Sequence, residues 1–371
     1  MTGLYVHVPF CLKKCHYCNF VITLSKGRGE FLDSLAAEAA HAAGSFEGRD
    51  FQTLYVGGGT PSALSVPETR ELFSILHKNF SLKKTEEQTW EANPLDVTEE
   101  KAACWRELGI NRVSLGAQSF RDKTLEAINR DHTSNTIHRA AEILRKEGFG
   151  NLSVDLILSL PNETVEDVTF SLNEAMKLRP QHVSLYELTI EKKTVFGSWH
   201  EQGRLSRPCE EEQIKMLALA RDFLKEEGFI HYELLSHAKP GFESWHNRIY
   251  WANREYLGLG PGAFSYWGGR RFRHSGSYEE YVGKIQKKDW SAREEETLDA
   301  QAKEIESFLL ALRLAEGAAA DRFKSLLKKM EKNLEALQEK GLLLRDRRSI
   351  RLTPKGQLFA ETVFSELSSI D

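Results

Sequence analysis

The 371-residue sequence contains no apolar run near the roughly 20 residues that a membrane-spanning helix needs. It does not open on a basic segment followed by an apolar one, so no secretion signal is expected. We therefore predict a cytoplasmic protein, in whose reducing surroundings structural disulfides are rare. Positive and negative charges are nearly balanced, because the sequence has 50 Lys and Arg residues and 54 Asp and Glu residues. The net charge of -4 gives no global argument for a nucleic-acid partner.

Cysteine is scarce, and its distribution is uneven. Of the five cysteines, Cys11, Cys15 and Cys18 fall within eight residues near the N-terminus. An odd total with such a cluster indicates a metal site rather than a disulfide framework. Cys104 and Cys209 stand alone in the sequence, and we expect them to be an ordinary packed thiol or surface thiol.

The length exceeds the roughly 250 to 300 residues at which one hydrophobic core stops growing, so we expect a large domain and a smaller one. In the first two thirds, short β-rich runs alternate with amphipathic helical stretches such as 29–43 and 136–147. This pattern is typical of βα units around a parallel sheet. It predicts an α/β fold with a partial or complete barrel, although an open doubly wound sheet gives nearly the same local pattern. The predicted strands are 4–8, 53–56, 87–91, 112–115, 151–158 and 182–188.

The predicted domains are a barrel over residues 1–230, a connecting segment over 231–300 and a C-terminal domain over 301–371. In the last of these, helical runs at 304–314 and 320–340 precede β segments at 342–344 and 350–352. This order predicts a small α+β domain of winged-helix type. The three arginines within 345–348 are interpreted as part of a solvated hairpin tip, so we expect no nucleic-acid partner.

Polar and glycine residues follow the ends of the predicted strands. They are Gly57–Thr60, Glu91, Gln118 and Asp155. In (β/α) barrels the loops at the carboxyl ends of the strands build the active site. The run Gly57, Gly58 and Gly59 lacks Cβ atoms and would let a ligand approach the backbone.

The spacing Cx3Cx2C places three thiolates in one loop directly after the first predicted strand. Soft thiolates select zinc or an iron–sulfur cluster. Structural zinc takes four protein ligands, so His16 or a distant residue would have to complete such a site. The alternative is a [4Fe-4S] cluster with three irons bound by cysteine and the fourth iron open to another ligand.

Six motifs, taken in order, resemble the coproporphyrinogen III oxidase-like branch of the radical S-adenosylmethionine (SAM) proteins. The resemblance covers nearly the whole chain, and the motifs are YVHVPFC (5–11), GGGTPS (57–62), EANP (91–94), NRVSLGAQSF (111–120), NRDH (129–132) and DLILSLP (155–161). The resemblance implies a radical SAM barrel of the partial (β/α)6 type. It also implies a [4Fe-4S] cluster on Cys11, Cys15 and Cys18, with SAM bound beside it.

Two features of the oxidases in this branch are missing from the sequence. Cys18 is followed by Asn19 and Phe20 instead of completing Cx3Cx2CxC, and only ten residues precede Cys11. The segment HNRIYW (246–251) is similar to the HNxxYW motif of the HemW-type haem chaperones. The segments YLGLGPGA (256–263) and LTPKG (352–356) also resemble that group. The resemblance therefore favours a haem chaperone over an oxidase.

The resemblance also implies roles for single residues. It places Gly57, Gly58, Gly59 and Thr60 at the amino group of SAM, Glu91 and Arg130 at its ammonium and carboxylate, and Gln118 and Asp155 at its ribose. Tyr5 would stack near SAM, and Phe20 would shield the cluster or pack on the adenine. For haem it implies His246 as an axial ligand, with His231, His237 and His274 as less specific alternatives.

The function implied is a chaperone that binds the cluster, SAM and haem and delivers haem to respiratory haemoproteins, with a peripheral membrane contact left open. The alternative is a radical SAM enzyme, such as an oxygen-independent coproporphyrinogen III oxidase-like decarboxylase. The sequence does not decide whether SAM is cleaved, so enzymatic activity stays open.

Overall fold

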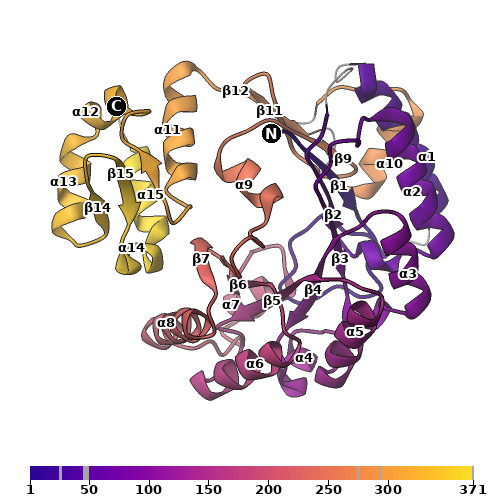
Figure 1. Ribbon diagram of the computed structural model, residues 1–371, viewed down its shortest axis with the longest axis horizontal. Coiled ribbons are helices and arrows are strands. Elements are labelled where there is room, and N and C mark those ends of the chain that lie inside the picture. Colours follow the sequence, from indigo (N-terminus) through magenta and orange to yellow (C-terminus); the bar gives the residue numbers. More distant parts are fainter. Residues whose placement is uncertain (25–26, 45–49, 274–275, 293, 370–371) are drawn as a thin grey trace.

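A computed structural model of the chain describes residues 1–24, 27–44, 50–273, 276–292 and 294–369 (Figure 1). Its central sheet contains six parallel strands that are neighbours in chain order, and all six match predicted strands. In the described residues the sheet runs from β12 to β7 without closing, which makes the barrel a partial one. The predicted α/β fold is confirmed. The six strands are β1 (Gly3–Val8), β2 (Thr53–Gly58), β3 (Glu87–Ala92), β4 (Arg112–Gln118), β5 (Asn151–Leu158) and β6 (His182–Glu187).

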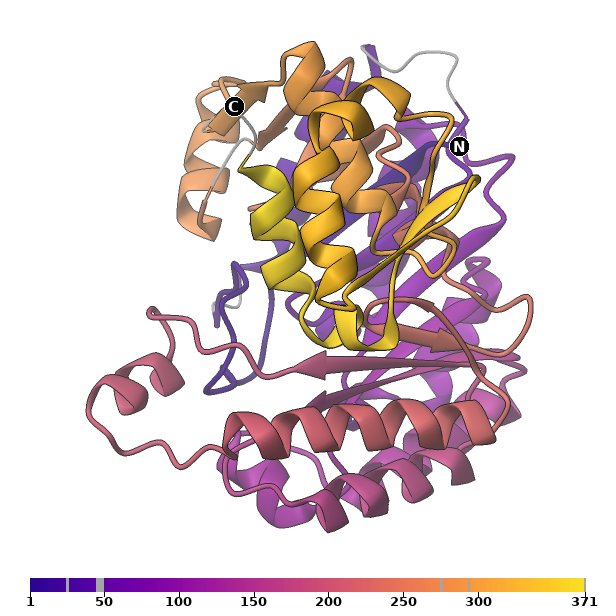
Figure 2. The same cartoon turned by 90° about the vertical axis from the view of Figure 1, so that its left-hand side faces the viewer.

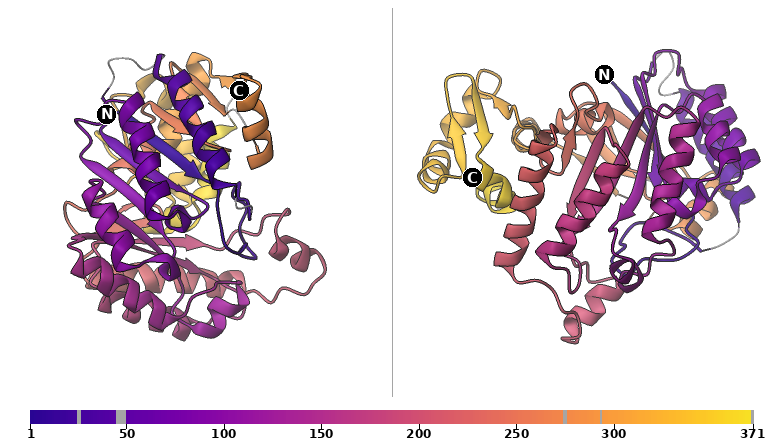
Figure 3. Two further views of the ribbon diagram at one scale, coloured as in Figure 1. Left: turned by 90° about the vertical axis from the view of Figure 1, so that its right-hand side faces the viewer. Right: turned by 60° about the horizontal axis from the view of Figure 1, so that its bottom comes forward.

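Helices cover the outer face of this sheet (Figures 1 and 3). Local sequence fixes several of their starts: the Ser65 hydroxyl accepts a hydrogen bond from the Glu68 amide, and the Glu68 carboxylate accepts one from the Ser65 amide at 2.7 Å. No described helix is long and apolar enough to cross a bilayer. The elements are α1 (Arg28–Ala43), η2 (Pro61–Ala63), α2 (Val66–Asn79), η3 (Pro94–Asp96), α3 (Glu99–Glu107), α4 (Asp122–Ala127), α5 (Ser134–Lys146), α6 (Val165–Lys177), α7 (Val195–Glu201) and α8 (Glu210–Glu226).

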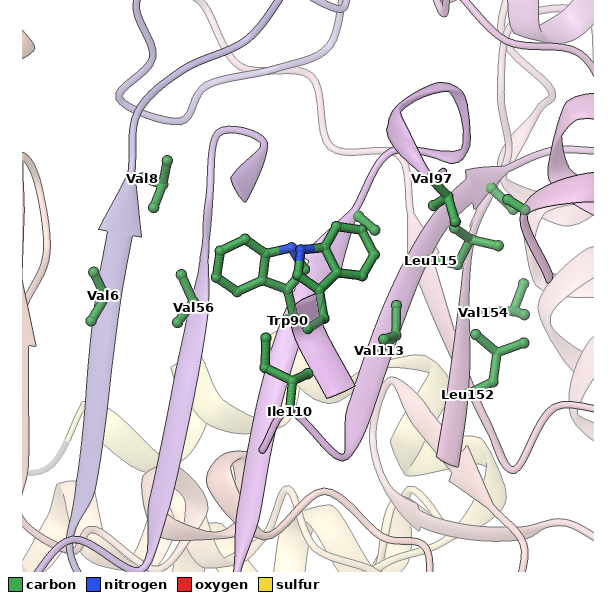
Figure 4. Close-up of a cluster of buried hydrophobic side chains, with 14 of the residues drawn as sticks. Val6, Val8, Val56, Trp90, Val97, Ile110, Val113, Leu115, Leu152 and Val154 are labelled. Carbon is green, nitrogen blue, oxygen red and sulfur yellow. The ribbon is translucent and has the colours of Figure 1, made fainter. Parts of the chain in front are cut away.

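The two faces of the parallel strands carry different chemistry, because successive side chains in a strand point to opposite sides. One face carries Val, Leu and Trp side chains that pack against the helices (Figure 4). At the centre of this apolar face, the ring centres of Trp90 and Trp105 of α3 lie 5.9 Å apart, and both side chains are buried. The opposite face turns polar side chains into the barrel, and these include Tyr5, His7, Tyr55, Glu91, Ser114 and Asp155.

The predicted connecting segment contributes further strands at both ends of the sheet. β8 pairs antiparallel with β6, whereas β9 pairs parallel with β1, so this stretch of chain runs from one edge to the other. The sequence did not predict these strands, and the domain boundaries at 230 and 300 stay a prediction. The elements are β7 (Ile230–Glu233), β8 (Ser236–Ala238), α9 (Trp245–Trp251), β9 (Tyr256–Leu259), β10 (Ser265–Trp267), β11 (Arg270–Arg273), α10 (Tyr278–Gln286) and β12 (Glu294–Thr297).

The C-terminal unit, residues 300–369, has a hydrophobic core of its own that includes Phe308, Leu337 and Ile350. Figure 2 views the molecule from the side that carries this unit. The predicted order of helices and a β hairpin is confirmed, but the helix predicted over 320–340 is two helices that meet at the buried Met330. The elements are α11 (Ala300–Ala311), β13 (Ala318–Ala319), α12 (Lys324–Lys329), α13 (Glu331–Glu339), β14 (Leu343–Arg345), β15 (Ser349–Leu352), α14 (Pro354–Leu358) and α15 (Ala360–Ser368).

Two candidate binding cavities

A cavity of about 500 Å³ lies at the carboxyl ends of the parallel strands, and we call it the barrel cavity. Its size is in the range of small-molecule and cofactor sites. The structure brings the predicted site residues together here, apart from Tyr5, Gly57 and His246. The lining includes Cys11, Cys15, Cys18, Phe20, Gly58, Gly59, Thr60, Glu91, Gln118, Arg130, Asp155 and Tyr186.

The cysteine loop lies between β1 and α1 and turns all three thiols toward the barrel cavity. The Cys18 amide donates to the Cys15 carbonyl at 3.2 Å, and Thr60 Oγ1 lies 3.3 Å from Cys11 Sγ. Burial raises the pKa of Cys11 to about 11 and also raises that of Cys18. Metal binding by such thiols therefore releases protons. Three soft donors facing one cavity fit an iron–sulfur cluster.

His16, the residue considered as a fourth zinc ligand, does not line the barrel cavity. Its Nδ1 lies 3.1 Å from the Ala127 carbonyl, and its ring lies 4.9 Å from Trp199 of α7. Among the described residues, no three His, Cys, Asp or Glu side chains gather as the ligands of a single metal ion. The lone cysteines lie elsewhere, Cys104 buried in α3 and Cys209 exposed before α8.

Arg130 joins the cysteine loop to strand β4. Its Nη1 lies 3.6 Å from Cys15 Sγ, and its Nη2 donates to the Gly116 carbonyl at 2.8 Å. Asn129, which the sequence analysis did not single out, donates from Nδ2 to the Lys14 carbonyl at 2.7 Å. The NRDH motif thus fixes the position of the cysteine loop and brings a permanent positive charge to the cavity.

Glu91 is the buried carboxylate at the base of the glycine run. It accepts hydrogen bonds from the Tyr55 hydroxyl at 2.7 Å and from the Gly58 amide at 3.0 Å. Burial raises the pKa of Glu91 to about 7. The carboxyl therefore changes charge near neutral pH, which is a useful property in a group that binds a cation.

The structure adds a second reason for the three glycines. A Cβ atom on Gly57 would lie 2.7 Å from Glu91 Cδ, and one on Gly58 would lie 2.4 Å from His7 Nδ1. Gly58 also has φ of +105°, which side-chain-bearing residues avoid. A Cβ on Gly59 would lie 2.8 Å from the Val8 carbonyl oxygen. The chain's own packing thus requires glycine at these positions, even before a ligand is considered.

Gln118 and Asp155 lie on neighbouring strands across the cavity. Gln118 follows a register shift in β4 and has φ of +68°. Asp155 accepts hydrogen bonds from Ser114 Oγ at 3.0 and 3.1 Å, and burial raises its pKa. Both side chains present hydrogen-bonding groups of the kind that binds hydroxyls.

A second cavity of about 540 Å³ lies between the barrel and α11, and we call it the aromatic cavity. Tyr5 lines this cavity and not the barrel cavity, and its place beside SAM stays a prediction. Phe20, with 67% of its surface exposed, lines both cavities. The lining is Tyr5, His7, Asn19, Phe20, Val21, Tyr250, Trp251, Asn253, Tyr256, Gly262, Phe264, Arg271, Arg273, Glu306 and Leu310.

His246 does not reach either cavity. It is fully buried, with Nδ1 2.7 Å from Thr53 Oγ1 and Nε2 2.8 Å from the Tyr250 hydroxyl. Burial lowers the pKa of His246 to about 3, so the ring is neutral. Because both ring nitrogens are engaged, the predicted axial bond from His246 to haem iron does not fit this arrangement. His246 instead anchors Tyr250, whose ring lines the aromatic cavity.

Glu87 fixes the helix that carries the HNxxYW motif. Its carboxylate accepts hydrogen bonds from the first two amides of α9, those of Trp245 at 2.9 Å and His246 at 3.0 Å. Of the alternative histidines, His231 and His237 stack on each other at 4.3 Å and line neither cavity. His274 lies outside the described residues.

Residues 5–175 match the radical SAM superfamily, and residues 298–359 match the HemN C-terminal domain. The haem chaperone HemW of Bacillus subtilis is 34% identical to this chain over 98% of both proteins. HemW of Lactococcus lactis is 35% identical over 98% of this chain and 97% of the relative. The chain belongs to the HemW family. The resemblance predicted from its motifs is confirmed.

The HemW-family chain has the fold of a solved radical SAM enzyme. The coproporphyrinogen III oxidase HemN from Escherichia coli superposes with a TM-score of 0.88 over 99% of this chain and 90% of the enzyme. The two sequences are 23% identical, so the likeness establishes the shared fold. In this HemW-family chain, Asn19 and Phe20 directly after Cys18 line both cavities.

Proposed function

We propose that this chain is a haem chaperone that holds a [4Fe-4S] cluster and SAM in the barrel cavity and haem in the aromatic cavity. The observation that carries the proposal is the aromatic cavity, which adjoins the barrel cavity at Asn19 and Phe20. Two arginines and several aromatic rings suit a flat apolar ligand with acidic groups. We further propose that the protein is cytoplasmic and delivers haem to respiratory haemoproteins, with a peripheral membrane contact left open.

In the barrel cavity, Cys11, Cys15 and Cys18 would bind three irons of the cluster, and the fourth iron would face SAM. A bound and reduced cluster supplies an electron donor beside SAM. Glu91 and the Gly58–Thr60 turn would hold the amino group, and Arg130 would hold the carboxylate. Gln118 and Asp155 would bind the ribose, and Phe20 would cover the site.

In the aromatic cavity, Tyr250 and Trp251 would pack on the tetrapyrrole ring. Tyr250 is held from two sides, by His246 Nε2 at 2.8 Å and by the Tyr256 ring at 4.6 Å. Trp251 Nε1 is buried and has no hydrogen-bond partner among the described residues, which leaves a donor for a ligand. His246 thus positions the HNxxYW segment.

The proposal is tested on protein reconstituted anaerobically, by titration with haem and by assay of 5'-deoxyadenosine after addition of SAM and dithionite. We expect stoichiometric haem binding with little SAM cleavage. Substrate-stimulated cleavage, or turnover of coproporphyrinogen III, would instead support the radical SAM enzyme.

Variants separate the two cavities. Replacing Cys11, Cys15 and Cys18 together by Ala should abolish the visible absorbance of the cluster but leave haem binding intact, whereas Cys209→Ala should change neither. Trp251→Ala should lower haem affinity about tenfold through lost contact area. Trp290→Ala is the matched control, because Trp290 stacks on His41 away from both cavities. A triple variant that still binds four irons contradicts the cluster assignment.

A further inference from the structure

Arg271 and Arg273 are alternate residues of β11, and both line the aromatic cavity. Alternate residues of a strand share one face, so the two guanidinium groups approach the cavity from the same side. The intervening strand position does not line the cavity, and Arg270 pairs with the exposed Glu295 at 2.8 Å. A pair of inward arginines beside aromatic rings is a binding site for carboxylates attached to a flat apolar body.

A carboxylate of the protein itself already occupies part of this site. Glu306 of α11 accepts two hydrogen bonds from Arg271, one of them from Nη2 at 3.1 Å. The Asn253 side chain donates to the same carboxylate at 3.1 Å. Both partners of the ion pair keep 24% of their side-chain surface exposed, so the pair lies on the cavity wall. The bidentate geometry is the one that a ligand carboxylate would adopt.

Arg273 has one buried side-chain donor without a hydrogen-bond partner among the described residues. Its guanidinium lies 5.0 Å from the centre of the Phe264 ring, which lines the same cavity. Its Nη2 pairs with Glu294, whose side chain is half exposed. Its Nε is buried and finds no hydrogen-bond partner among the described residues. This Nε is therefore a donor that a ligand carboxylate can use.

From this arrangement we infer that the aromatic cavity recognises the two carboxylates of a tetrapyrrole through Arg271 and Arg273, and that Glu306 competes with the ligand for Arg271. The inference deepens the proposed haem function and rests on it. When a ligand carboxylate replaces Glu306, the C-terminal unit loses a contact with β11. Ligand binding and docking of α11 are therefore opposed, and by reciprocity each weakens the other.

Other contacts keep the C-terminal unit in place after this exchange. Arg313 lies 4.2 Å from the centre of the Trp251 ring, and its carbonyl accepts from the Leu234 amide at 3.0 Å. The Asn253 side chain also donates to Ser307 Oγ at 2.9 Å. Exchange at Arg271 thus loosens one edge of the interface, the edge next to the cavity, without detaching the unit.

The experiment compares binding of iron-free protoporphyrin IX and of its dimethyl ester to the full chain by quenching of tryptophan fluorescence. The ester keeps the ring but lacks the acidic groups, and the absence of iron removes any axial bond. We expect the acid to bind the unmutated protein about 10- to 100-fold more tightly than the ester, in line with charge-assisted hydrogen bonds. Equal affinity for acid and ester would overturn the inference.

Variants then assign the effect to residues. Arg271→Gln and Arg273→Gln should each weaken binding of the acid about tenfold and leave the ester unchanged, while Arg270→Gln, the exposed neighbour, should change neither. Glu306→Gln should strengthen binding of the acid, because the competing charge is gone. Weaker binding of the acid by Glu306→Gln would contradict the competition between Glu306 and the ligand. This measurement tests the inference even if an arginine variant does not fold.

This experiment and the test of the proposed function fail in different ways. If haem does not bind at all in the absorbance titration, the haem function itself fails. If haem binds but the protein does not distinguish the acid from its ester, only the assignment of Arg271, Arg273 and Glu306 fails.

Discussion

The barrel cavity and the aromatic cavity have similar volumes but are built differently. The barrel cavity takes its walls from the ends of consecutive parallel strands, from the cysteine loop and from the loops at 129–131 and 188–191, all in the first 191 residues. The aromatic cavity combines β1, the end of the cysteine loop, α9, β11 and α11, which are far apart in the sequence. The first cavity depends on the parallel strands and the loops beside them, whereas the second also depends on how α9 and the C-terminal unit pack against the sheet.

Their chemistry differs in the same way. The barrel cavity contains buried carboxyls, thiols and one arginine, each held by hydrogen bonds from neighbouring strands or loops. The aromatic cavity presents rings and two arginines whose acidic partners, Glu306 and Glu294, come from later elements. The first site is therefore fixed when the barrel forms, while the second also depends on the placement of α11.

The largest effect on stability is expected for His246→Ala, because His246 holds Tyr250 of the aromatic cavity in place. The change leaves a buried void and removes the partners of Thr53 Oγ1 and the Tyr250 hydroxyl, so unfolding free energy should fall by about 3 kcal/mol. Urea denaturation measures this, with Asn247→Ala in the same helix as control. The Soret band of bound haem should keep its position. A shifted band in a variant of normal stability would restore the axial-ligand interpretation.

The same variant has a pH signature. Burial lowers the pKa of His246 to about 3, so below about 6.5 the unfolded chain takes up the proton before the folded one does. The wild type therefore loses stability as pH falls, and the variant lacks this contribution. The difference in stability between them should shrink by about 2 kcal/mol from neutral pH to pH 5.

A smaller effect on stability is expected for Gly58→Ala, a change in the lining of the barrel cavity. The new Cβ would meet the His7 ring at 2.4 Å on a backbone with positive φ. We expect a loss of about 2 kcal/mol relative to Gly148→Ala. Gly148 also has positive φ but no atom within 4 Å of its Cβ position, so this control isolates the clash. Equal losses in denaturation curves would show that the His7 contact is unimportant.

The smallest effect is a pH dependence of SAM binding. Because burial raises the pKa of Glu91 to about 7, its carboxylate form, which we propose attracts the SAM amino group, becomes the main form above that pH. SAM affinity measured by calorimetry should therefore rise about tenfold from pH 6 to pH 8. Glu91→Gln should bind more weakly and lose the pH dependence, whereas Glu187→Gln at the same cavity should keep it. A flat profile in the unmutated protein excludes this role for Glu91.

The sequence was informative where one local pattern determines the structure. Each parallel strand has helices on one side and a polar interior on the other, so its side chains alternate between apolar and polar with period two. This alternation located β1 to β6 to within a few residues. Residues at their carboxyl ends, such as Glu91, Gln118 and Asp155, then had to meet in one cavity.

The aromatic cavity could not be predicted from such local sequence patterns. β11 and β12 have the sequences RRFR and EEET, whose charged side chains pair across the strands and give no apolar signal. The HNxxYW motif identified the right helix but not the direction of each side chain, so Tyr250 and Trp251 face the cavity while His246 is buried behind them. The break at Met330 has neither Gly nor Pro to mark it.

Phe20 has a consequence for energetics as well as for shape. One aromatic ring forms part of the wall of both cavities, with 67% of its surface still exposed to solvent. Any rotation of this ring that improves the fit of a ligand on one side changes the contact surface on the other side. With SAM and haem bound as we propose, thermodynamic reciprocity requires that the factor by which SAM alters haem affinity equals the factor by which haem alters SAM affinity.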